Sequence, residues 1–84
     1  MTAFLNAFDA LPLGVFQGVS GGRRYVVTRQ DLAGGAAQKL VAEERGGPDY
    51  ISLNLYRLAS GPLLKPCEMP QEKVIEFVLG LTPN

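Results

Sequence analysis

Alternation of apolar and polar side chains, beginning at Ile51, constrains this 84-residue chain more than any other feature. Ile51, Leu53 and Leu55 alternate with polar or aromatic residues, which is the two-residue period of a strand with one buried face. Residues 59–62, Ala-Ser-Gly-Pro, interrupt the pattern as a turn does, and residues 63–68 run back extended. The segment is therefore predicted to be a β-hairpin whose apolar face the rest of the chain covers.

A second hairpin is predicted nearer the N-terminus, from residues 13–19 and 24–29. The second of these segments is rich in strand-forming residues. The Gly-Gly pair at 21–22 supplies the positive φ values that a tight hairpin turn requires. Adjacent valines at 26 and 27 point to opposite sides of a strand, so the sequence leaves open which face of this hairpin is buried.

Three segments have the apolar spacing of helices. Residues 2–11 place four apolar side chains on one face, with Thr2 as a cap; the alternative is an N-terminal arm that docks on a second subunit. Residues 33–45 form an apolar stripe at i, i+1, i+4 and i+5, with Asp31 as the cap and Gly46 as the stop. A third helix is predicted to begin at Pro70. Its apolar stripe consists of Val74, Phe77, Val78 and Leu81.

These segments predict one α+β domain over residues 1–84, in the order (α)-ββα-ββα, with residues 1–12 as the N-terminal helix or arm. The expected fold is a two-layer sandwich, a mainly antiparallel four-stranded sheet with the helices on one face. Because the middle helix is long enough to form a crossover, a parallel pair between residues 24–29 and 50–58 is also compatible with the sequence.

Composition limits the function. Eight basic and eight acidic residues cancel, which argues against nucleic-acid binding, since such domains usually carry a positive excess. No apolar run approaches the roughly 18–20 residues of a membrane span, and the N-terminus lacks the basic region of a signal peptide. A single cysteine, Cys67, favours a reducing compartment such as the cytoplasm. A chain this short buries only about 60–65% of its unfolded surface, so association with a second subunit would help its stability.

The sequence contains only weak indications of a catalytic site. On an extended strand Lys65 and Cys67 share a face, and a nearby ammonium favours the reactive thiolate, but the chain has no histidine to act as a base. Cys67 is therefore read as a small packed side chain rather than a nucleophile, and no zinc site, other metal site or cofactor is predicted. The acidic residues at 68, 72 and 76 are read as a solvated helix face, and Gly34-Gly35 as a loose helix start rather than a phosphate-binding loop.

The polar face of the predicted sheet is the candidate binding surface. Ser52, Asn54 and Tyr56 lie on it, Tyr25 joins them in one of the two registers of the first hairpin, and Arg24, Arg29 and Arg57 lie in the same strands. These residue types occur in protein–protein interfaces, in proteins that bind single-stranded nucleic acid, and on ordinary solvated sheets. The leading hypothesis is a non-catalytic protein-binding or self-associating module. The alternatives are a single-stranded nucleic-acid binder and a thiol-dependent enzyme that uses Cys67.

Overall fold

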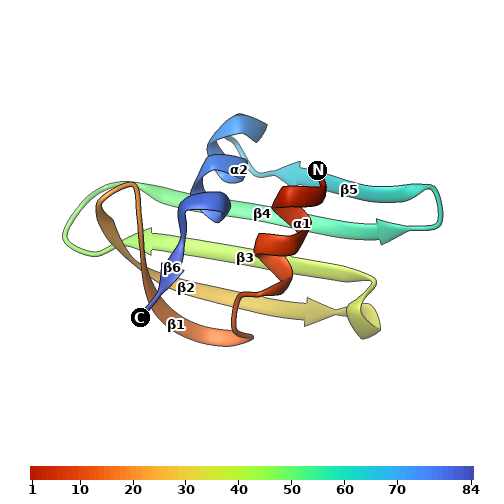
Figure 1. Cartoon of the computed structure of the whole chain (residues 1–84), viewed down its shortest axis with the longest axis horizontal. Coiled ribbons are helices and arrows are strands. Elements are labelled where there is room, and N and C mark those ends of the chain that lie inside the picture. Colours follow the sequence, from red (N-terminus) through yellow and green to blue (C-terminus); the bar gives the residue numbers. More distant parts are fainter.

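In the computed structural model, which describes residues 1–84, two α-helices lie against one face of a six-stranded sheet (Figure 1). In chain order the elements are α1 (Thr2–Asp9), β1 (Gly14–Ser20), β2 (Arg23–Leu32), β3 (Ala37–Glu44), β4 (Tyr50–Leu58), β5 (Gly61–Pro66), α2 (Gln71–Gly80) and β6 (Thr82–Pro83), with a 3-10 turn, η1, over Ala33–Gly35. The predicted α+β class is confirmed. The predicted number of four strands was wrong, because the sheet also contains β3 and the short β6.

The strands follow the order β5-β4-β3-β2-β1-β6, and every neighbouring pair is antiparallel. Both predicted hairpins are present. Gly21 and Gly22, with φ values of 60° and 77°, make the turn between β1 and β2. Ala59 and Ser60 connect β4 to β5. The parallel pair that the sequence allowed between β2 and β4 does not form, because β3 lies between them.

The helix predicted over residues 33–45 is instead the turn η1 followed by strand β3. Ala33, Gly34 and Gly35 all have positive φ values (50°, 66° and 92°), so the chain reverses there rather than entering a right-handed helix. Asp31 is therefore a residue of β2 and caps no helix. β3 pairs with β2 on one side and β4 on the other, and this pairing overrides the local helical spacing because both neighbouring strands would otherwise present open edges.

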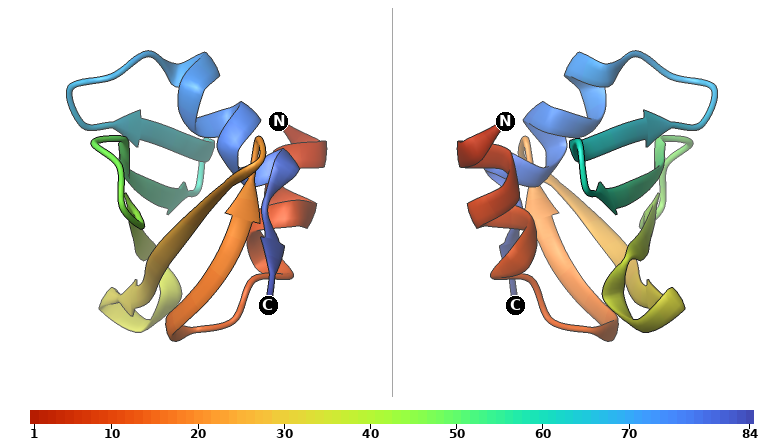
Figure 2. Two further views of the ribbon diagram at one scale, coloured as in Figure 1. Left: turned by 90° about the vertical axis from the view of Figure 1, so that its left-hand side faces the viewer. Right: turned by 90° about the vertical axis from the view of Figure 1, so that its right-hand side faces the viewer.

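The core lies between the inner face of the sheet and the two helices, and the sheet bends around them (Figure 2). In β4 the predicted Ile51, Leu53 and Leu55 are each at most 1% exposed. Phe4 and Phe8 of α1 are buried, and the rings are 5.7 Å apart. α1 begins at Thr2 with no side-chain cap, so the predicted capping role of Thr2 was wrong. From α2, the buried side chains are Val74, Phe77 and Val78.

Proline limits hydrogen bonding along the β5 edge of the sheet. The N–H of Cys67 donates to the carbonyl oxygen of Ser52 at 2.9 Å, so N–H groups of odd-numbered residues on this strand point toward β4. The even-numbered positions point away from the sheet, and two of these three are Pro62 and Pro66, which have no N–H. This edge therefore presents a single outward N–H donor, that of Leu64.

Candidate functional site

The side of the sheet that faces away from α1 and α2 is uncovered, and we call it the outer face. It consists of the even-numbered side chains of β2 and β4 and the odd-numbered side chains of β1, β3 and β5, since their neighbours in sequence are the buried ones. Seven of the large apolar residues that are exposed in the structure lie here: Val15, Val26, Leu32, Tyr50, Tyr56, Leu58 and Leu63.

Four of the outer-face side chains form a continuous apolar row across four strands. In the strand register Leu32 lies opposite Ala37, Ala37 opposite Tyr56, and Tyr56 opposite Leu63. Leu32, Tyr56 and Leu63 are 45%, 36% and 40% exposed. Side chains directly opposite each other on one face are in contact range, so these residues make one apolar row rather than scattered exposed side chains.

Basic residues gather on the same outer face. Beside the apolar row, Lys39 lies opposite Asn54, and Asn54 opposite Lys65. Arg24 lies on β2, and the guanidinium of Arg45, just after β3, reaches across to donate to Gln17 Oε1 at 2.7 Å. The face thus carries four of the eight basic residues of the chain and only one of its eight acidic residues, Glu43. Although the net charge of the chain is zero, its outer face is therefore net positive and the opposite side net negative.

Some of the residues predicted for this surface lie on it and others do not. Ser52, Asn54, Tyr56 and Arg24 are on the outer face. Tyr25, Arg29 and Arg57 are on the helix-covered side, so their predicted grouping with the other four was wrong. The reason is that alternate residues of a strand share a face: Tyr25 and Arg29 lie on the same side of β2 as the fully buried Val27.

Arg29 and Arg57 tie the end of α1 to the sheet. The guanidinium of Arg29 donates to the carbonyl oxygen of Leu11 at 2.6 Å and lies 4.7 Å from the ring centroid of Phe8. Arg57 pairs with Asp9 and donates to Gln38 Oε1 at 2.9 Å. These contacts are intramolecular and hold α1 in place, so neither arginine is available on the predicted surface.

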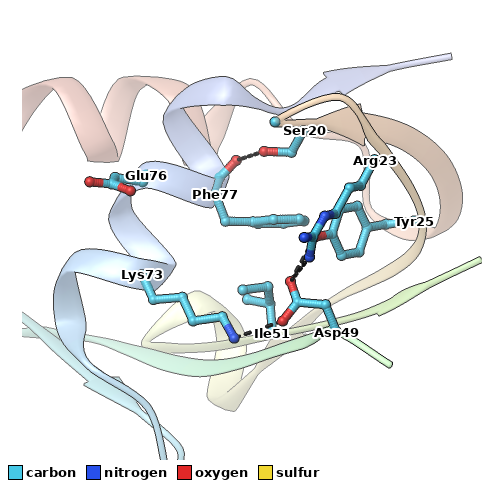
Figure 3. Close-up of a pocket in the computed structure, with 9 residues that line it drawn as sticks. Ser20, Arg23, Tyr25, Asp49, Ile51, Lys73, Glu76 and Phe77 are labelled. Carbon is cyan, nitrogen blue, oxygen red and sulfur yellow. Dashed lines mark hydrogen bonds and ion pairs between the residues drawn. The ribbon is translucent and has the colours of Figure 1, made fainter. Parts of the chain in front are cut away.

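Tyr25 belongs instead to a cluster centred on Asp49, between the sheet and α2 (Figure 3). The Tyr25 hydroxyl donates to Asp49 Oδ2 at 2.7 Å, and Lys73 Nζ donates to Oδ1 at 2.7 Å. Arg23 lies 3.9 Å from the same carboxylate. The Tyr25 ring packs edge-on against Phe77 with centroids 4.8 Å apart. Residues from β2, α2 and the loop before β4 thus meet beside an open cavity of about 300 Å³.

The protonation states of Tyr25 and Asp49 are fixed at neutral pH. Burial, the hydrogen bond to Asp49 and the negative charge of that carboxylate raise the pKa of Tyr25 to about 12. Hydrogen bonds from Lys73 and Tyr25 lower the pKa of Asp49. Efficient general acid–base catalysis needs a group that titrates near the working pH. Neither group does, so the cluster is suited to holding α2 against the sheet rather than to proton transfer.

Cys67 follows β5, and its thiol is half-buried. Its Sγ accepts a 3.7 Å hydrogen bond from the Asn54 side-chain amide. An amide cannot accept the thiol proton as a general base does. The structure therefore adds no catalytic partner to the sequence-based hypothesis of a reactive thiol.

At its far end, beneath the turn between β3 and β4, the outer face has a hollow of about 450 Å³ lined partly by Glu43, Pro48 and Tyr50.

No three His, Cys, Asp or Glu side chains gather as metal ligands would. Neither helix combines the length and hydropathy that crossing a bilayer requires. Comparison of the chain with protein-family models, curated proteins and solved structures finds no match.

Sequence reasoning missed the apolar row and the Asp49 cluster. The row depends on Ala37 being a strand residue, whereas residues 33–45 were predicted to be a helix. Asp49 lies in the loop between β3 and β4, where no functional residue was predicted. The one sequence feature that could have drawn attention to Asp49 is its position directly before the alternating segment that forms β4. Its partners Tyr25 and Lys73 are each 24 residues away in sequence, so no local pattern connects the three.

Proposed function

We propose that this protein is a non-catalytic protein-interaction module that assembles through the outer face of its sheet. The observation that carries this proposal is the uncovered apolar row formed by Leu32, Ala37, Tyr56 and Leu63. Contiguous exposed apolar surface of this kind is typical of interaction sites. Tyrosine is enriched in such sites because its ring is both apolar and able to form hydrogen bonds.

Both edges of the sheet are poorly suited to pairing with a strand of another chain. This supports association through the outer face instead. Pro62 and Pro66 remove two of the three outward N–H positions on β5. At the opposite edge, β6 pairs with β1, and Asn84 donates to the carbonyl oxygen of Gln17 at 2.9 Å. We place the module in a reducing compartment such as the cytoplasm, because its one cysteine has no second cysteine in the chain with which to form a disulfide.

Light scattering across micromolar protein concentrations tests the proposal. We expect the average mass of the native chain to rise with concentration, and Leu63→Asp to lower it toward the monomer value by placing a charge in the apolar row. Ala3→Asp is the matched control, because it adds the same charge at an exposed position of α1. A constant monomer mass for the native chain, or equal assembly by Leu63→Asp, contradicts the proposal.

A second candidate function, single-stranded nucleic-acid binding, is favoured by the four basic residues on the outer face beside the exposed rings of Tyr50 and Tyr56. Exposed rings can stack on bases while basic side chains contact phosphates. Fluorescence anisotropy with a labelled oligonucleotide tests it, and binding must weaken as salt is raised. No binding at low salt rejects this alternative.

A further inference from the structure

We infer that the outer face docks on helix α2 of a second copy of this chain, so that copies associate head to tail. This inference rests on the proposed function and names the partner. The outer face is basic, whereas the exposed side of α2 and the residues that precede it are acidic. Because the two surfaces lie on opposite sides of the molecule (Figure 2), one copy can present each to a neighbour.

The ion pairs within the chain define these surfaces. The basic residues that form intramolecular ion pairs are all on the helix-covered side or at its margin: Arg23, Arg29, Arg57 and Lys73. The remaining four, Arg24, Lys39, Arg45 and Lys65, lie on the outer face, and none of them has an ion-pair partner in the chain. The outer face therefore has unpaired positive charge available for a partner.

The matching negative charge lies along α2 and just before it. Glu68, Glu72 and Glu76 follow one another at intervals of four residues, are exposed, and form no intramolecular ion pair. Residues four apart lie on the same side of a helix, so Glu72 and Glu76 share the solvent side of α2.

An apolar contact accompanies the charges. Leu79, in the last turn of α2, is 51% exposed, and Ile75, four residues earlier, is half-buried. On the outer face the apolar row lies next to the row that contains Lys39 and Lys65. Each surface thus combines an apolar strip with a charged strip, and the charges are of opposite sign.

Helix and sheet dimensions allow this docking. The ten residues of α2 span about 15 Å, and the four strands that carry the apolar row span about the same distance. Docking the outer face on the outer face of another copy would bring like charges together, which is unfavourable. A head-to-tail contact uses two different surfaces, so it generates a ring or a filament rather than a two-fold dimer.

The test uses two charge-reversal variants of the full chain, Lys39→Glu with Lys65→Glu on the face, and Glu72→Lys with Glu76→Lys on the helix. Light scattering at roughly 0.01 M salt, where charges act over about 30 Å, measures the mass of each. We expect each variant alone to remain monomeric, because its face and helix then carry the same sign. An equimolar mixture should regain the mass of the native assembly, and so should the chain with all four substitutions. Circular dichroism verifies that every variant is folded.

Each other outcome overturns the inference. If the face variant is monomeric but the helix variant assembles as the native chain does, the face binds something other than α2 and only the proposed function survives. If the native chain is a monomer at every concentration, the head-to-tail inference and the proposed function are both wrong. If a labelled oligonucleotide binds the native chain and dissociates any assembly, the face is a nucleic-acid site.

Discussion

The hydroxyl of Tyr25 donates a 2.7 Å hydrogen bond to Asp49 Oδ2, and this bond joins the start of β2 to the residue that precedes β4. Lys73 completes the link by donating to the other carboxylate oxygen from α2. Hydrogen bonds to charged groups are stronger than neutral ones. Through Lys73, this three-residue cluster connects α2 to the sheet.

Tyr25→Phe should lower the free energy of unfolding by about 1.5–3 kcal/mol, because it removes a hydrogen bond to a charged acceptor from a buried site. Urea denaturation at pH 7 measures the loss. The variant keeps the ring that packs on Phe77, so the apolar contact serves as an internal control. An unchanged urea midpoint would show that the bond contributes nothing to stability.

Alkaline pH should destabilise the native protein through the same residue. The pKa of Tyr25 is about 12 in the folded chain and about 10 in the unfolded chain. A raised folded-state pKa gives stability that is complete below pH 10 and is lost as the pH rises toward 12. We expect a fall of about 1.4 kcal/mol per pH unit in that range, absent from Tyr25→Phe. Tyr50 and Tyr56 are present in both proteins, so the difference between the two curves isolates Tyr25.

Asp49→Asn should reduce stability at neutral pH and remove part of the acid sensitivity. The lowered pKa of Asp49 means that its contribution is present above the unfolded-state pKa of about 3.9 and is lost as the pH falls through the folded-state value. The unfolding curves of the native and variant chains should therefore differ at pH 7 and approach each other as the pH falls below 4. Curves that stay separated by the same amount at both pH values would contradict the role given to this carboxylate.

Leu53→Ala should cost about 2–5 kcal/mol, because Leu53 is fully buried and its loss leaves a cavity in the core. Leu63→Ala is the matched control, since Leu63 is 40% exposed on the outer face and its truncation should change the stability of the unassociated chain by roughly 0.5 kcal/mol or less. Thermal or urea denaturation measures both. Equal losses would mean that the outer face is as well packed as the core.

Replacing both prolines of the β5 edge, Pro62→Ala with Pro66→Ala, should promote irreversible aggregation. The substitutions restore two outward N–H donors on an edge strand, which can then pair with another chain. Turbidity measured over time at a fixed temperature follows the effect. Pro12→Ala, at an exposed position outside the sheet, is the control and should behave as the native chain does.

Local sequence was sufficient for the elements whose signal is contained in neighbouring residues. Alternation around Leu53 predicted β4, the Gly-Gly pair predicted the first hairpin turn, and the apolar stripe after Pro70 predicted α2. In each, spacing and turn chemistry agree with the observed packing. The same reasoning failed at residues 37–44, where the spacing is compatible with a helix and pairing with β2 and β4 decides the outcome.

The sequence by itself determined the α+β class, both hairpins and the buried face of β4. Only the tertiary structure decided that β3 is a strand, that Tyr25 faces the helices, and that the balanced charges separate onto opposite sides. The physical reason is that turn preference and periodicity act between neighbouring residues, whereas strand register is set by partners far away in the chain. A shift of one residue exchanges the two faces of a strand, so the composition of each face follows only from the assembled sheet.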